Sequence, residues 1–235
     1  MNDEPSRSYA VNLFRVTLLS VVFIGLFAGP ALARNFYFNG NGGVNSLDCY
    51  DCVVNYKSNI SIRDGGYEFR LNRPTSWRNR NAKVMLIRNV PNRWEFTADV
   101  KIQSGFDQRV WTVLAQSKPR RNRGRCGPIW TFGLYETNLA KSWVFHHTGE
   151  RRKRTTRSNM VRHGQRFRLQ IDGSSHRHGW VSVSINGRQI FRYTGDMLKG
   201  RYCSDSQHMF GFGNYVGSTT RQHTVWMDNI SLRHR

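Results

Sequence analysis

The chain has 235 residues, and its 36 Lys and Arg against 15 Asp and Glu leave a formal net charge of +21. Apolar residues make up 38% and aromatic residues 13%, which excludes a disordered polycation, because such chains are poor in aromatic side chains. The charge predicts a polyanionic partner, which leaves nucleic acid, acidic polysaccharide and an anionic membrane surface as candidates.

The N-terminal segment has the pattern of a secretory signal peptide. Arg7 and Arg15 precede the apolar run 16–28, and Ala-Leu-Ala follows at 31–33. We expect cleavage after Ala33, because the run is short for a membrane span. The alternative is an uncleaved signal anchor. Residues 1–33 are therefore predicted to direct secretion to an extracellular or periplasmic location, with no stable membrane insertion after cleavage.

Cysteine usage agrees with export. An even number of cysteines in a secreted chain favours disulfides, here with three possible connectivities. We expect Cys49–Cys52 and Cys126–Cys203 to be structural pairs. The Cys49-Tyr-Asp-Cys52 sequence is also compatible with a redox or half-zinc motif, but a zinc site would need a second close pair.

The remaining chain predicts strands and almost no helix. Apolar and polar residues alternate with a period of two over 94–103, as in a strand with one buried face. Asn186-Gly187 separates two such segments and predicts a two-residue hairpin turn. The pattern favours one all-β domain over 34–235, a jelly-roll β-sandwich of two antiparallel sheets. The expected strands are 66–71, 83–88, 94–103, 110–116, 129–135, 143–147, 167–172, 180–185, 189–193, 209–215 and 224–232.

Two basic segments, 118–125 and 151–157, interrupt this pattern. They are either solvated loops or the flanks of a groove that attracts a polyanion, and the second could also be a site of proteolytic processing. In the groove interpretation, Lys118, Arg120 and Arg121 bind substrate.

Several enzyme classes are disfavoured. A glycosidase needs two carboxyl groups across the scissile bond, and only four Glu follow the signal segment, with no acidic residues on alternate strand positions as a pair would need. The sequence contains no G-x-S-x-G or H-E-x-x-H motif. Its histidines show no organised set of metal ligands, so we expect neither a metal nor a cofactor.

The segment 209–215 carries the positive signal. Phe210 and Phe212 point to one side of a predicted strand, and Gly211, Gly213 and Tyr215 to the other. Two glycines beside a tyrosine leave a trough where a chain could lie close to the backbone. The alternative is tight sheet packing with a tyrosine at the edge.

A sheet face that offers Arg70, Gln116 and Tyr215 suits β-elimination of a uronic acid polymer. The cation and the amide neutralise the carboxylate and so acidify the C5 proton. Tyrosine or histidine then removes this proton and protonates the leaving oxygen.

At these residues the sequence resembles the concanavalin A-like jelly-roll polysaccharide lyases, a group with heparin lyase-like, glucuronan lyase-like and alginate lyase-like members. The resemblance covers roughly residues 94–232. Its segments are Trp111 with 113–116, the strand 179–187 that ends in Asn-Gly, 193–195, 210–215 and 227–230. It implies that Tyr215 is the catalytic acid or base, that Gln116 neutralises the carboxylate and that Asn214 contacts substrate.

The sequence also departs from this family pattern. Lys118 stands where these lyases often have a histidine, and Gly211 where they often have a lysine. His147, which alternates with Trp143 and Phe145, could replace the missing histidine.

We therefore expect a secreted, monomeric lyase that cleaves an acidic polysaccharide and recognises no specific nucleic acid. The alternatives are a non-catalytic lectin-like module on the same fold and, ranked last, nonspecific nucleic-acid binding through the arginine loops.

Overall fold

The computed structural model describes residues 35–49, 52–55, 57–71, 81–86, 93–103, 110–119, 127–136, 141–148, 154–157, 161–198, 208–216 and 223–235. The segment Asn35–Arg235 forms one compact unit. The predicted signal peptide, Arg120, Arg121, Cys126 and Cys203 lie outside the described residues. Within the described ranges, no helix is both long enough and apolar enough to cross a membrane.

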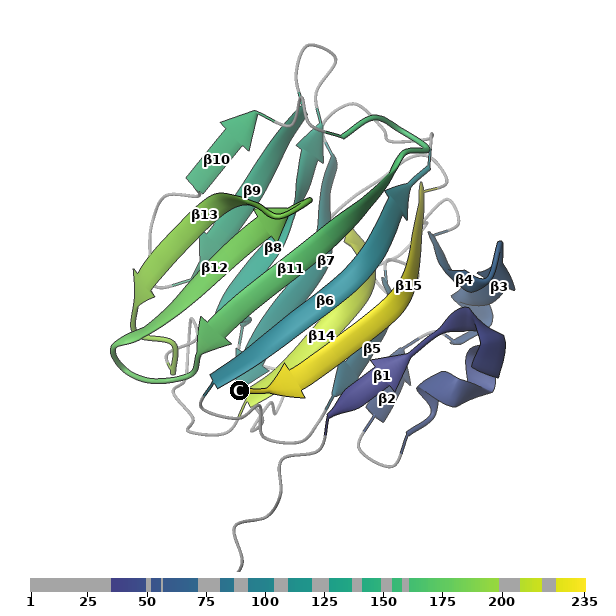
Figure 1. Ribbon diagram of the computed structural model, residues 1–235, viewed down its shortest axis with the longest axis horizontal. Coiled ribbons are helices and arrows are strands. Elements are labelled where there is room, and N and C mark those ends of the chain that lie inside the picture. Colours follow the sequence, from purple (N-terminus) through teal and green to yellow (C-terminus); the bar gives the residue numbers. More distant parts are fainter. Residues whose placement is uncertain are drawn as a thin grey trace, which may run out of the picture. The chain divides into compact units, whose positions relative to one another are not determined.

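Two antiparallel sheets make up the fold (Figure 1). The eight-stranded sheet has the order β13 (Arg188–Gly195), β12 (Gly179–Ile185), β11 (Arg166–Ser174), β6 (Arg93–Ile102), β15 (His223–His234), β4 (Gly66–Leu71) and β3 (Ile60–Arg63), with β1 (Phe36–Phe38) paired to β15. The seven-stranded sheet has the order β10 (Arg154–Arg157), β9 (Lys141–His147), β8 (Trp130–Glu136), β7 (Val110–Pro119), β14 (His208–Val216), β5 (Asn81–Leu86) and β2 (Cys52–Asn55). Three short 3-10 helices lie near the described N-terminal end, at Gly40–Gly42, Val44–Leu47 and Lys57–Asn59.

The alternation predicted for β6 is confirmed. Its apolar residues from Trp94 to Ile102 are buried at every second position, and the residues between them are partly exposed. The predicted hairpin also joins β12 to β13, with Asn186 at φ 50° and Gly187 at φ 78°. Positive φ at both central residues is what a tight hairpin turn requires, and asparagine and glycine adopt it most readily.

Aromatic rings fill the space between the sheets. Trp94 of β6 stacks on Trp130 of β8 with 5.8 Å between ring centroids. Phe96 of β6 lies 4.8 Å from Phe210 of β14 and 5.8 Å from Phe212. Each of these contacts joins one sheet to the other, so the aromatic side chains hold the two layers in register.

A β-bulge interrupts the middle of β7. Val113 pairs with Gly133 of β8 and Ala115 with Phe132, so Leu114 has no partner across this ladder. Leu114 and Ala115 both belong to the buried core. The extra residue shifts the alternation, so Gln116 lies on the face opposite the core. A regular strand would place Gln116 on the same side as Thr112.

Cys49 forms a disulfide with Cys52, the first residue of β2, as predicted. The structure adds four strands that the sequence pattern did not reveal, β1, β2, β3 and β10, each three or four residues long. Such short segments carry too few alternating positions to stand out from loops.

Candidate active site on the seven-stranded sheet

The outer face of the seven-stranded sheet is turned away from the core. It carries several of the polar side chains predicted for the active site. One cross-strand row runs from Gly211 in β14 through Gln116 in β7 and Thr131 in β8 to His146 in β9. Lys83, Lys118 and Tyr215 lie on the same face beside this row. We call Lys83, Gln116, Lys118, Thr131, His146 and Tyr215 the site face.

Lys83 is the most perturbed group of the site face. Strand alternation buries its neighbours Ala82 and Val84 completely and directs Lys83 outward. Its ammonium lies 4.8 Å from the centroid of the Tyr215 ring. Burial, together with the positive charge of Lys118, lowers the pKa of Lys83 to about 7. A lysine with this pKa can gain and lose a proton near neutral pH.

Gln116 and Lys118 come from β7, beyond the bulge. Gln116 is 3% exposed and lies opposite Gly211, while Lys118 lies opposite Met209. Burial lowers the pKa of Lys118 as well. The strand therefore places an amide and a partly desolvated amine on one side of β14.

Glycine gives the site face its shallow floor. Lys83, Gln116, Gly211, Gly213 and Tyr215 are among the residues that line a small depression here. Gly213 has φ 129°, and a Cβ atom at this position would lie 2.5 Å from the backbone oxygen of Ala82. The close approach of β5 therefore requires glycine here, as in the tight sheet packing that was the alternative to a trough, and the trough expected from 209–215 stays a prediction.

Thr131 lies between Gln116 and His146 in the row. Its hydroxyl is buried and has no hydrogen-bond partner in the described part of the chain. An unpaired buried hydroxyl costs free energy unless a ligand or water satisfies it. Thr131 therefore offers a hydrogen bond to a molecule lying on the site face.

His147 does not reach this face, contrary to the prediction. Its ring is 4% exposed and stacks on Tyr193 of β13 at 4.7 Å between centroids. The Nε2 atom lies 2.8 Å from the backbone oxygen of Asp196, which accepts a hydrogen bond from it. The parity of β9 explains the error, because Phe145 and His147 face the core and the residue between them, His146, faces outward.

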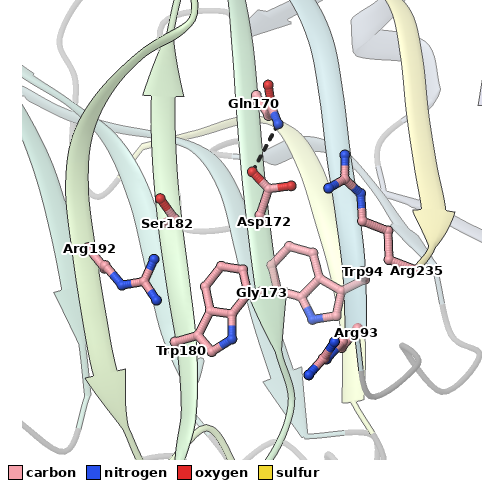
Figure 2. Close-up of a pocket in the computed structure, with 9 residues that line it drawn as sticks. All are labelled: Arg93, Trp94, Gln170, Asp172, Gly173, Trp180, Ser182, Arg192 and Arg235. Atoms are coloured by element: carbon pink, nitrogen blue, oxygen red, sulfur yellow. Dashed lines mark hydrogen bonds between the residues drawn. The ribbon is translucent and has the colours of Figure 1, made fainter.

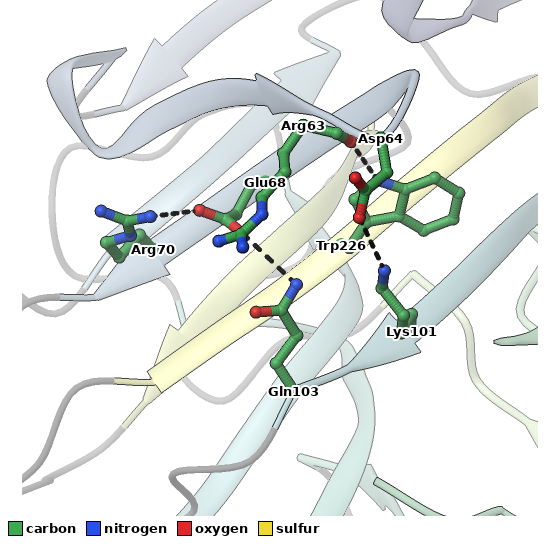
Figure 3. A network of polar contacts seen from close by, with 7 residues as sticks. All are labelled: Arg63, Asp64, Glu68, Arg70, Lys101, Gln103 and Trp226. Carbon is green, nitrogen blue, oxygen red and sulfur yellow. Dashed lines mark hydrogen bonds and ion pairs between the residues drawn. The ribbon is translucent and has the colours of Figure 1, made fainter. Parts of the chain in front are cut away.

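Arg70 also lies elsewhere. It belongs to β4 of the eight-stranded sheet, where its guanidinium donates to the buried carboxylate of Glu68 (Figure 3). Arg63 pairs with the same carboxylate at 3.5 Å, and Gln103 donates to it at 3.3 Å. Arg70 therefore helps to neutralise a buried acid and does not share a face with Tyr215 and Gln116.

Asn214 is fully buried, so it cannot contact substrate as predicted. Its amide nitrogen donates to the backbone oxygens of Phe69 and His223 in the other sheet. Its side-chain oxygen accepts from Nδ1 of His223, whose Nε2 lies 3.1 Å from the hydroxyl of Thr112. Burial lowers the pKa of His223 to about 3, which keeps this ring neutral between the sheets.

Sequence reasoning missed Lys83 and His146 as site residues. Lys83 lies between Ala82 and Val84, and a lone lysine flanked by buried positions in a strand is the signal that could have marked it. For His146 the cue was weaker, since either member of the His146-His147 pair could face outward. Among the described residues, no group of three or more His, Cys, Asp or Glu side chains is placed to hold a metal ion.

No protein-family model matches the sequence, and no curated protein matches it either. Solved structures do match. Alginate lyase Aly36B is 17% identical with a TM-score of 0.63, over 87% of this chain and 98% of that enzyme. A variant of Aly36B with a lysine and a tyrosine replaced by alanine, in complex with an alginate tetrasaccharide, gives 16% identity and a TM-score of 0.64 over 87% and 98%.

Alginate lyase PA1167 from Pseudomonas aeruginosa is 14% identical with a TM-score of 0.55, over 75% of this chain and 86% of that enzyme. At identities this low, the structural matches establish a shared architecture. The segment Asn35–Arg235 has the jelly-roll β-sandwich fold of these alginate lyases.

Proposed function

We propose that this protein is a lyase that cleaves a uronate-containing polysaccharide by β-elimination on the site face. The observation that carries the proposal is the pair formed by Lys83, with a pKa of about 7, and Tyr215 beneath its ammonium. The pair lies next to the amide of Gln116 and the amine of Lys118, beside a small depression lined by Gly211 and Gly213.

The pair supplies both proton transfers of the reaction. The neutral amine of Lys83 takes the proton from C5 of the uronate, and the electron pair left behind forms the C4–C5 double bond. The bond between C4 and the glycosidic oxygen breaks, and the hydroxyl of Tyr215 donates its proton to that oxygen. The ammonium of Lys83 then returns a proton to the Tyr215 phenolate, which restores both groups.

Gln116, Lys118 and Thr131 act on the uronate carboxylate. Removal of the C5 proton places negative charge on this carboxylate, so donors fixed around it stabilise the transition state. Gln116 donates through its amide, Lys118 through its ammonium and Thr131 through its hydroxyl. Lys118 thus takes the position at which the resembling lyases often carry histidine.

The comparisons support alginate as the first substrate to test. The chain shares its fold with alginate lyases, and one of them is described in complex with an alginate tetrasaccharide after replacement of a lysine and a tyrosine. Lysine and tyrosine are the residue types of the Lys83–Tyr215 pair.

Purified protein should produce an ultraviolet absorbance from unsaturated uronate with alginate, glucuronan or heparin. Tyr215→Phe should reduce kcat by about 10²-fold or more, the range expected for removal of a general acid. The matched control is Tyr135→Phe, the same change at an exposed tyrosine of β8, and its kcat should stay within about twofold. No absorbance with any of these polymers, or full activity in Tyr215→Phe, would contradict the proposal.

One further measurement on the same incubations distinguishes a lyase from the lectin-like alternative. Size-exclusion chromatography of the polymer after incubation shows whether the chains are shortened. Saturable binding with no change in polymer size would identify a non-catalytic module.

We also infer that the protein is exported through its N-terminal segment and acts as a monomer. The disulfide between Cys49 and Cys52 supports an oxidising compartment. N-terminal sequencing of the protein from culture fluid or periplasm should begin after Ala33, and light scattering should give the mass of one chain. A mature chain that retains residues 1–33 would refute the cleavage.

A further inference from the structure

A second pocket lies on the outer face of the eight-stranded sheet, on the other side of the sandwich from the site face. Its volume is about 490 Å³. Trp180 of β12, Asp172 of β11, Arg192 of β13 and the Arg93 and Arg235 side chains surround it (Figure 2). The proposed reaction uses none of these residues.

Trp180 forms an aromatic surface at one side of the pocket. Strand alternation buries Val181 and Val183 and turns Trp180 outward, where it stays partly exposed. The guanidinium of Arg192 lies over one face of its ring, 5.1 Å from the centroid. A large aromatic ring at the surface beside a cation is suited to stack against a sugar ring and to pair with the sugar's acidic group.

The charges around the pocket leave a positive excess. Arg235 pairs with Glu95, so this carboxylate is already neutralised. Arg93 is exposed and makes no ion pair within the described ranges, and Arg192 is also exposed. Arginine guanidinium groups suit planar pairing with carboxylates.

Asp172 contributes a hydrogen-bond acceptor at the centre of the pocket (Figure 2). One of its carboxyl oxygens accepts from Gln170 at 3.0 Å, and the other is buried with no partner in the described part of the chain. Burial raises the pKa of Asp172, and the negative charge of Glu95 raises it further. A buried acceptor without a donor is suited to receive a hydroxyl of a sugar.

We propose that this pocket is a second, non-catalytic subsite that binds the acidic polysaccharide. A sugar ring stacks on Trp180, its carboxylate pairs with Arg192 or Arg93, and a hydroxyl donates to Asp172. The identity of the ligand rests on the proposed lyase function, since the substrate is the acidic chain expected near this surface. A subsite behind the cleavage site would keep a long polymer attached between cleavage events.

The test measures binding without turnover. The Tyr215→Phe protein is run in native gels that contain alginate, with heparin as the second polymer, and its retardation gives a dissociation constant. Adding Trp180→Ala to this protein should weaken retention about five- to tenfold while leaving the net charge unchanged. Adding Arg192→Ala should weaken it to a similar degree.

Two matched controls separate the subsite from the general charge of the protein. Tyr37→Ala removes an exposed aromatic ring from β1 in the same sheet, and Arg188→Ala removes an exposed charge from the same strand as Arg192. Both should retain the affinity of the Tyr215→Phe protein. Equal losses for Arg188→Ala and Arg192→Ala, or unchanged retention for Trp180→Ala, would overturn the subsite.

The two proposals fail in distinguishable ways. If no polymer is cleaved but Trp180→Ala and Arg192→Ala weaken retention, the lyase function fails and the subsite stands. If alginate is cleaved and retention does not depend on Trp180 or Arg192, the subsite fails and the lyase function stands. Thermal melting of each variant checks folding, and Arg192→Ala keeps the test valid if Trp180→Ala does not fold.

Discussion

The surroundings of the Lys83 amine disfavour its protonated, charged form. Burial removes water from around the amine, and Lys118 adds a like charge nearby, so the pKa falls to about 7. Below this pH the ammonium dominates and cannot accept a proton, and above it the amine is free to do so. The protonation state of one side chain should therefore set the pH range of the reaction.

We predict that kcat/KM for alginate rises about tenfold per pH unit below the pKa of Lys83 and levels off above about pH 7. Lys83→Met should lower kcat by about 10²- to 10⁴-fold and remove this inflection from the residual activity. Lys57→Met is the control, because Lys57 is exposed, pairs with Asp48 and takes no part in the proposed reaction. An unchanged pH profile in Lys83→Met would assign the titration to another group.

At the scale of elements, β14 contributes to both the site and the core. Its outward positions supply Gly213 and Tyr215, and the Asn214 side chain between them points inward to His223 of β15. Any change that moves this strand should alter activity and stability together.

Gly213→Ala tests the floor of the site. Its Cβ would meet the backbone oxygen of Ala82 at 2.5 Å, and positive φ is strained for alanine, so β5 and β14 must separate. We expect a stability loss of about 2 kcal/mol or more in urea unfolding and a lower kcat/KM, because Lys83 pairs with Gly213.

The control for this change is Gly164→Ala, where φ is also positive but the new Cβ would meet no atom within 4 Å. It should cost about 1 kcal/mol and leave kcat/KM unaltered. Equal effects at both positions would show that the close approach of β5 is unimportant.

His223 couples the sheets in a pH-dependent way. Its pKa is about 3 in the folded protein because of burial and the nearby His163, against an ordinary value of 6.5. The unfolded chain therefore binds a proton between these limits that the folded chain does not. Stability is full above about pH 6.5 and falls as the pH drops toward 3, by about 1.4 kcal/mol per pH unit below about pH 6.

Urea unfolding at several pH values should show this slope. His223→Gln should lower stability at pH 7.5 and flatten the slope between about pH 6 and 4. His178→Gln, at an exposed position, should leave the slope intact. A slope that survives in His223→Gln would place the responsible proton elsewhere.

Strand periodicity predicts these elements well, since the long strands β6 and β11 alternate between a buried face and a more exposed one. It predicts Tyr215 and Gln116 on a common face, but Gln116 reaches that face only because of the bulge at Leu114. His147 and Arg70 were misplaced for different reasons. The face that His147 occupies depends on which residues of β9 point inward. The position of Arg70 depends on which sheet β4 joins, and this is decided by long-range strand pairing.

At the scale of the whole molecule, the net charge of +21 acts on the approach of a polyanion. Long-range attraction raises the rate of encounter and is screened once the Debye length falls below the distance between charges. The site face and the second pocket both present cations, so we expect an acidic polymer to be attracted to either side of the sandwich.

We expect kcat/KM for polymeric alginate to fall about tenfold or more between roughly 0.05 M and 0.5 M NaCl, mainly through KM. The kcat at saturating polymer should change much less, because the charges that act in the reaction are partly shielded from solvent. Stopped-flow and steady-state assays across this range measure both effects. A kcat that falls in parallel with kcat/KM would point instead to loss of the folded site.

The bulge in β7 also bears on how this strand tolerates changes in length. Leu114 and Ala115 both point inward, so loss of Leu114 would make β7 regular against β8 with its two ends on their present faces. Against β14 the existing irregularity at Gly213 and Asn214 would widen by one residue. Gln116 and Lys118 would still point outward, and Thr112 would still reach His223. A one-residue deletion in a regular strand exchanges the two faces beyond the deletion point. Position 114 is therefore a place where related chains can differ by one residue in length and still present the same chemistry.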